Sequence, residues 1–165
     1  VALGFGLWAA LWMIGWPLPL IPASSGASHG VLMVDGVLAS LIGIERAVAL
    51  ERRVFYAAPL VTALGAISLV FTGNLTTAFS IVTVGALLLL LNFAVILRRQ
   101  PAVHTAVHLI GAGCLVGGNL LGVLNYDIPF LIPLWGSFLV LLLAGERLEL
   151  TRIRRMSLSG WLTFG

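Results

Sequence analysis

Residues 78–97 read AFSIVTVGALLLLLNFAVIL and contain no charged side chain. An α-helix needs about 20 predominantly apolar residues to cross the hydrocarbon core of a bilayer. Arg98 and Arg99 follow at once, at the point where such a helix would leave the lipid. The stretch therefore predicts a transmembrane helix that ends in a basic pair.

The rest of the chain has the same character. Of 165 residues, 60% are hydrophobic and 9% are charged, whereas roughly a quarter of the residues in a soluble domain are charged. The lone Cys114 excludes a disulfide or a cysteine-based zinc site within the chain. We predict an all-α, polytopic integral membrane helix bundle with six transmembrane helices in one domain, residues 1–155. Residues 156–165 form a C-terminal segment, the candidate start of a further helix. The six predicted segments cover approximately residues 1–20, 29–50, 56–73, 78–97, 102–124 and 129–150.

The basic residues predict the orientation of this bundle. All nine are arginines, and in a six-span arrangement they fall on one side: Arg46, Arg52, Arg53, Arg98, Arg99, Arg147, Arg152, Arg154 and Arg155. Because cytoplasmic loops are enriched in basic residues, we expect this side, with both observed ends, to face the cytoplasm. The connectors 23–28, 74–77 and 125–128 are then external. The expected location is a bacterial inner membrane, with the lipid bilayer as the partner and no role for nucleic acid.

An outer layer of polar residues is predicted near the external ends of the helices. It holds His29, Asp35 and Asn119. An aspartate at this depth needs a proton, a partner or water, so Asp35 either lines a polar pocket with Asn119 or makes a structural hydrogen bond. His29 either caps a helix near the headgroups or ligates a metal or haem, since neutral imidazole is the commonest metal ligand.

An inner layer contains two Glu-Arg pairs, Glu45-Arg46 and Glu146-Arg147, which form a weak internal repeat. Adjacent residues point roughly 100° apart on a helix, so both members of a pair cannot simply face lipid. We predict crosswise pairing, Glu45 with Arg147 and Arg46 with Glu146. The alternative is that the arginines extend to the headgroups while the glutamates pair elsewhere.

Two histidines, His104 and His108, lie four residues apart and therefore share one helix face. They are candidate cofactor ligands or, alternatively, structural residues of an interfacial turn. The residues between them lack the glutamate of the metalloprotease motif, and no catalytic residue is predicted. About 15 to 20 Å of height should separate His29 from His108, so one haem iron cannot be held by both.

Several short motifs carry a distant resemblance. The stretch Leu7-Trp8-Ala9-Ala10-Leu11-Trp12 leads to His29-Gly30-Val31-Leu32-Met33-Val34-Asp35-Gly36, and Leu97-Arg98-Arg99-Gln100 and Gly117-Gly118-Asn119-Leu120-Leu121 follow. In this order they resemble motifs of the NnrS family of bacterial membrane proteins, which are associated with nitric oxide and described as containing haem and copper. The resemblance implies that His29 is a ligand of haem b or copper. Gly30 stands where the family has a glutamate, and only His29 matches by motif.

Three hypotheses of function follow. The first is a non-catalytic or redox-assisting membrane protein that binds haem or copper through His29 and is linked to redox or nitric-oxide chemistry. The second is a structural subunit that packs laterally against other membrane subunits. The third is a small-solute or proton transporter in which Asp35 and the inner charged layer form a discontinuous polar path.

Overall fold

A computed structural model describes residues 1–19 and 26–161, with side chains for residues 1–19 and 27–151. Every regular element in this part of the chain is helical. Four helical stretches are long and apolar enough to cross a membrane: Arg53–Thr72, Leu75–Arg99, Val103–Val123 and Ile128–Thr151. The all-helical prediction is confirmed, and so is the presence of several segments that could span a bilayer.

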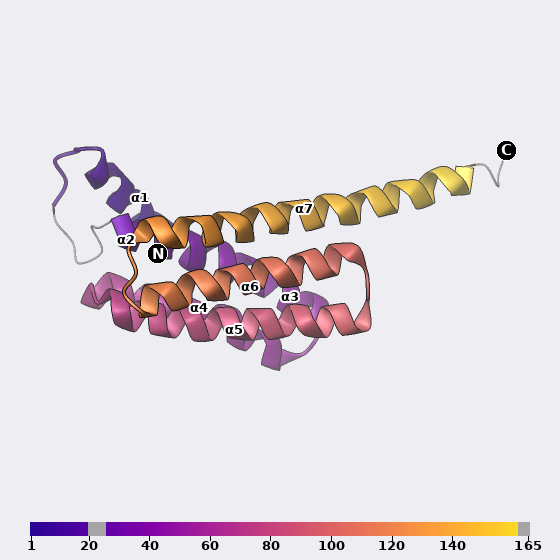
Figure 1. Ribbon diagram of the computed structural model, residues 1–165, viewed down its shortest axis with the longest axis horizontal. Helices are drawn as coiled ribbons and strands as arrows, with labels where there is room; N and C mark the ends of the chain where they lie inside the picture. The colour runs from indigo at the N-terminus through magenta and orange to yellow at the C-terminus, as the bar shows by residue number, and fades with distance from the viewer. Residues whose placement is uncertain (20–25, 162–165) are drawn as a thin grey trace.

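These stretches contain the helices α4 (Ala57–Thr72), α5 (Leu75–Arg99), α6 (Val103–Val123) and α7 (Ile128–Trp161). A short 3-10 turn, η2 (Arg53–Tyr56), precedes α4. Each long helix packs against the next along the chain, as the short connectors require, and Figure 1 shows them side by side. The start of α5 is capped by Asn74, whose side chain accepts a hydrogen bond from the Thr77 backbone N–H at 3.0 Å.

The segment predicted over residues 29–50 is one uninterrupted helical rod with an unusual middle. It consists of α2 (Gly26–Val31), a π-helical stretch η1 (Leu32–Ala39) and α3 (Ser40–Leu50). The junction residues Val31 and Ala39 keep right-handed helical dihedral angles, so the direction of the chain is preserved. The rod packs against α4 and α5. Stretches of π-helix are rare and occur frequently at functional sites.

The helix predicted over residues 1–20 is shorter than expected. Helix α1 covers Ala2–Met13, which is about 18 Å at 1.5 Å per residue and less than the roughly 30 Å of a hydrocarbon core. It ends because Gly15 takes a left-handed conformation, with φ +88°, and Pro17 disfavours a helical conformation for the residue before it. Val1 lies in a cleft beside Gly36 and Ala66. The first described residue therefore lies partway along the bundle.

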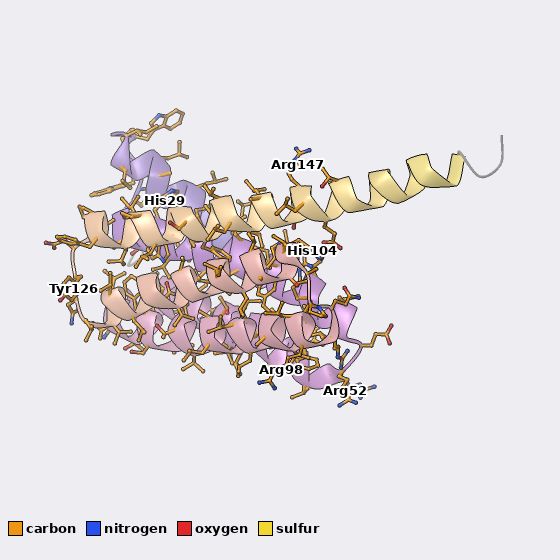
Figure 2. The ribbon with its side chains drawn as sticks, turned by 45° about the vertical axis from the view of Figure 1, so that its right-hand side comes forward. His29, Arg52, Arg98, His104, Tyr126 and Arg147 are labelled. Carbon is orange, nitrogen blue, oxygen red and sulfur yellow. The ribbon has the colours of Figure 1, made fainter. Side chains whose placement is uncertain are left out.

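The two ends of the bundle differ in chemistry. Figure 2 shows Arg52 and Arg98 at one end, hereafter the arginine end, and Tyr126 at the other, the Tyr126 end. Helix α7 projects beyond its neighbours at the arginine end (Figure 1) and runs without a break to Trp161. No helix end thus marks the predicted boundary at residue 155. Residues 162–165 of the C-terminal segment and residues 20–25 of the first connector lie outside the described part of the chain.

Candidate functional site

A chain of three buried side chains, which we name the outer polar cluster, links the rod to α6 and α7. Asp35 of η1 and Asn119 of α6 are both 0% exposed. The Asn119 Nδ2 donates to Asp35 Oδ1 at 2.7 Å, and the Trp135 Nε1 of α7 donates to Asn119 Oδ1 at 2.9 Å. Of the two alternatives predicted for Asp35, the structural hydrogen bond is observed, and its partner is Asn119.

Trp135 was missed by sequence reasoning, although two signals could have found it. The buried residues Leu131, Trp135, Phe138 and Leu142 recur at helical spacing along α7, and a buried indole N–H usually has an acceptor. Its ring enters the bundle where Gly30 leaves room, because a Cβ atom on that glycine would lie 2.6 Å from Trp135 Cζ3. Phe79 stacks on the indole with ring centroids 6.2 Å apart.

One carboxylate oxygen of the outer polar cluster has no hydrogen-bond partner among the described residues. Asp35 Oδ2 is buried and has no hydrogen-bond partner among the described residues. The other oxygen is engaged by Asn119. An uncompensated carboxylate charge in an apolar interior is expensive, so the free oxygen calls for a proton or for a ligand that can donate to it.

His29 lies apart from this cluster, on the half-buried face of α2 toward α1. Its Nδ1 is 2.8 Å from the carbonyl oxygen of Gly6. A carbonyl oxygen can only accept, so Nδ1 carries the proton; in the neutral imidazole Nε2 then has the lone pair. This is the arrangement in which a second partner orients a metal-ligating imidazole.

At the arginine end, Arg46 connects the two Glu-Arg pairs. Its guanidinium lies 2.9 Å from Glu45 Oε1 and 3.6 Å from Glu146 Oε1, both through Nη2. The predicted pairing of Arg46 with Glu146 is confirmed, and the predicted pairing of Glu45 with Arg147 is wrong. Arg147 is exposed and, in Figure 2, points away from the bundle, because the 100° step between neighbours places it on the outer face when Glu146 faces inward.

The Arg46 side chain is otherwise packed inside the protein. It is 11% exposed, and its Cζ lies 5.7 Å from the centroid of the Phe93 ring, within the range of a cation–π contact. Arg46 Nε is buried and has no hydrogen-bond partner in the described part of the chain. Arg46 therefore has donor capacity beyond its ion pairs.

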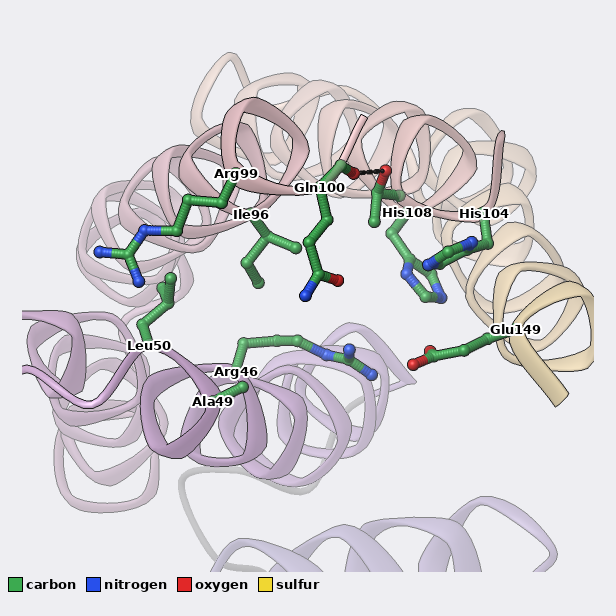
Figure 3. A pocket seen from close by; sticks show the side chains of 10 residues that line it. Arg46, Ala49, Leu50, Ile96, Arg99, Gln100, His104, His108 and Glu149 are labelled. Carbon is green, nitrogen blue, oxygen red and sulfur yellow. Dashed lines mark hydrogen bonds between the residues drawn. The ribbon is translucent and has the colours of Figure 1, made fainter. Parts of the chain in front are cut away.

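Beside Arg46 the helices leave a hollow of about 290 Å³, which we name the inner cleft. Residues of α3, α5, α6 and α7 line it, and Figure 3 shows their side chains around the hollow. Its lining consists of Arg46, Ala49 and Leu50 from α3, Ile96 and Arg99 from α5, Gln100, His104, Thr105 and His108 around the start of α6, and Glu149 from α7. Sequence reasoning had placed Arg46 and the two histidines in this layer but had missed Arg99, Gln100 and Glu149.

His104 and His108 are 7% and 2% exposed, and their ring centroids are 6.5 Å apart. The His108 Nε2 lies 3.2 Å from the Leu142 carbonyl oxygen, to which it donates. Gly145 permits this approach, because a Cβ there would collide with the His108 ring. Both predicted histidines thus line the inner cleft, and Figure 2 shows His104 at the opposite end of the bundle from His29.

Among residues 1–19 and 26–161, no three histidine, cysteine, aspartate or glutamate side chains come together as a metal site. A metal or haem at His29 would therefore take its remaining ligands from elsewhere.

Comparison with known proteins identifies the family. The chain belongs to DUF8744, a domain of unknown function, which it matches over residues 1–164. No curated protein and no solved structure matches it.

Proposed function

We propose that this chain is a polytopic protein of a bacterial inner membrane, with its arginine end in the cytoplasm. Support comes from the distribution of charge: the nine basic residues lie in or beside the segments that form this end, and basic residues concentrate on the cytoplasmic side of membrane proteins. The rod of residues 26–50 joins the four long helices as a fifth crossing, since its 25 residues (50 − 26 + 1) are enough to traverse the hydrocarbon. Helix α1 occupies the outer half.

A labelling experiment tests the orientation. Cys114 is replaced first, and single cysteines are then introduced at Asp127, in the connector before α7, and at Arg52, at the arginine end. A membrane-impermeant maleimide should label position 127 from outside intact cells and position 52 only after the membrane is opened. The reverse pattern would contradict the proposed topology.

Within this frame we propose that the protein carries protons, alone or with a small solute, and that Asp35 is the proton-binding group. The observation that carries the proposal is the free, buried Asp35 Oδ2. Ionisable residues inside membrane helices are costly and typically mark proton relays or solute pathways. A carboxyl group that holds one partner and leaves one oxygen free can take up and release a proton without dismantling the cluster.

The rod connects this group to the cytoplasmic side. Asp35 and Arg46 lie 11 positions apart on it, about 16 Å along the axis, and both contact helices across the bundle, Asn119 of α6 and Glu146 of α7. The π-helical turns around Asp35 supply a place where local hydrogen bonding can change, because π-bulges are weak points of a helix that are often used at functional sites. Asp35 and the ion pairs of Arg46 thus form two stations of a discontinuous polar path.

Proton flux into proteoliposomes tests the proposal directly. Purified protein is reconstituted with a pH-sensitive dye inside the vesicles, and a pH gradient with a defined potential is applied. The wild type should acidify or alkalinise the lumen faster than empty vesicles, and Asp35→Asn should return the rate to the empty-vesicle level. Asp127→Asn, an exposed aspartate in the connector before α7, is the matched control and should keep the wild-type rate. Undiminished flux in Asp35→Asn would refute the role of Asp35.

A second candidate function is haem or copper binding through His29. The geometry that favours it is the bond from His29 Nδ1 to the Gly6 carbonyl, which fixes the tautomer that leaves Nε2 for a ligand. This candidate places the chemistry on the external side, away from Asp35. It is distinguished from proton transport by what the purified protein contains.

A further inference from the structure

The inner cleft is a cavity that the proton path does not need. It lies where α5 ends and α6 begins, and it is bounded by α3 and α7 as well. Its volume of about 290 Å³ is at the small end of the range of ligand pockets in proteins, roughly 300 to 1,000 Å³. A small polar group would fit it, whereas a large planar cofactor would not.

Two arginines of the cleft keep unused hydrogen-bond donors. Figure 3 shows the Arg46 guanidinium and the Gln100 amide directed into the hollow, with the His104 and His108 rings along the α6 side and Arg99 at the rim. Arg46 keeps the buried, unpartnered Nε described above. Arg99 has no ion pair among the described residues.

Three glutamates lie at or beside the cleft, and two of them are engaged by Arg46. Glu45 and Glu146 both engage the same nitrogen of Arg46, Nη2. Glu149 is the one carboxylate that lines the cleft itself. Within the lining itself, two arginines and the Gln100 amide face a single carboxylate, and the unpartnered groups identified there are donors of Arg46 and Arg99.

From this arrangement we propose that the inner cleft binds a phosphate group that enters from the cytoplasmic side. The planar guanidinium matches the oxygens of phosphate, and basic pockets between transmembrane helices on the cytoplasmic side bind anionic lipid headgroups. The phosphate belongs either to an anionic lipid of the inner leaflet or to a small phosphorylated molecule in the cytoplasm. The proposal is independent of proton transport through Asp35.

Two binding measurements separate these sources. In the first, the full chain in a neutral detergent is titrated with inorganic phosphate at constant ionic strength, with sodium chloride as the reference salt, and the melting temperature is followed. In the second, native mass spectrometry counts phosphatidylglycerol or cardiolipin molecules retained by the protein, with phosphatidylcholine as the reference. A saturable stabilisation by phosphate indicates a soluble ligand, selective retention of the anionic lipid indicates a headgroup, and either result supports the site.

Variants tie the binding to the cleft. Arg46→Lys keeps the positive charge but loses the fork of donors, so it should weaken binding about tenfold or more. Arg99→Gln removes a rim charge and should weaken it by up to about fivefold. Arg98→Gln is the matched control, since Arg98 is an exposed neighbour that does not line the cleft, and it should change binding by less than about twofold. Asp35→Asn should bind phosphate like the wild type, which keeps this test separate from that of the proton path.

The proposal is overturned by either of two results. One is the absence of both phosphate stabilisation and selective lipid retention in a wild-type protein that unfolds cooperatively. The other is an equal loss in Arg98→Gln and Arg99→Gln, which would mean that the arginine end attracts anions only through its overall charge. Arg99→Gln lies on the surface and does not enter the ion pairs, so it remains informative if Arg46→Lys fails to fold.

Discussion

The outer polar cluster and the inner cleft both lie between the rod, α6 and α7, but they accommodate their polar side chains in opposite ways. At Asp35 the polar atoms are fully buried and are joined one to the next, with a single oxygen left over. At Arg46 the charges lie around a hollow, and the glutamates that pair with them are 58% and 41% exposed. The first arrangement is closed and neutral when Asp35 holds a proton; the second is open and charged.

The difference follows from depth. The hydrocarbon core of a bilayer offers no water to compensate an unpaired group, so a polar atom at that depth needs a protein partner or a proton. Near the membrane surface, water and headgroups can satisfy part of a charge. Substitutions in the closed cluster should therefore cost far more stability than comparable substitutions around the inner cleft.

The largest loss is expected for Trp135→Ala. The indole is 5% exposed, and its removal leaves a cavity and deprives Asn119 of a donor, so the free energy of unfolding should fall by about 3 kcal/mol or more. Titration with a denaturing detergent, followed by circular dichroism, measures the change. Trp16→Ala is the control, since Trp16 is 58% exposed, and it should stay within about 0.5 kcal/mol of the wild type. Equal losses for both tryptophans would contradict a closed cluster.

The hydrogen bond between Asp35 and Asn119 should give the next largest effect. Asn119→Leu leaves Asp35 Oδ1 and the Trp135 indole without partners, which should cost about 1 to 3 kcal/mol. The double variant Asp35→Leu/Asn119→Leu removes both members of this hydrogen bond and leaves neither of them unpaired. Its loss in the free energy of unfolding should therefore be smaller than the sum of the losses of the two single variants. A double-mutant cycle measures this coupling. Additive losses would mean that the two side chains do not stabilise each other.

A smaller effect is expected at the open end. Arg46→Gln breaks two ion pairs whose glutamates are partly exposed, and solvent screening limits the loss to about 1 kcal/mol. Arg147→Gln should leave the free energy of unfolding unchanged, because Arg147 has no ion pair among the described residues. The same detergent titration compares the two. If Arg147→Gln lowered the free energy of unfolding more than Arg46→Gln does, Arg147 and not Arg46 would be the inward-facing arginine.

How far the sequence predicts this structure depends on the kind of signal. The long apolar segments and the inward direction of Asp35 follow from simple rules, since apolar length and the cost of a buried carboxylate leave few alternatives. Asn119 could be predicted as the partner of Asp35 because both residues were expected at the same depth in the membrane. The third member, Trp135, was missed because an indole in an apolar helix reads as ordinary packing until its acceptor is known.

Other features depend on geometry that a linear pattern does not contain. A π-helical stretch shifts the helical phase over residues 32–39, and no composition rule marks it. The choice of Arg46 over Arg147 depends on the rotation of α7 about its axis, which only packing decides. The inner cleft could not be predicted, because it depends on how four segments are placed relative to one another. Its two histidines, at the predicted start of a helix, could be identified from the sequence.

Only a small stability change is expected at His29, where the measurement of interest is cofactor content. The bond from His29 Nδ1 to the Gly6 carbonyl is one half-buried hydrogen bond, so His29→Ala should lower the free energy of unfolding by about 1 kcal/mol or less and leave the helices intact. If Nε2 is a ligand, protein purified from cells supplied with haem and copper should contain a stoichiometric cofactor, and His29→Ala should lose it. His104→Ala is the control, because His104 lies at the opposite end of the bundle and should leave the cofactor in place. Optical spectra measure the haem content of each protein, and metal analysis measures its copper content. A wild type with neither a haem absorption band nor stoichiometric copper would reject the ligand role, and so would a His29→Ala variant that keeps its full cofactor content.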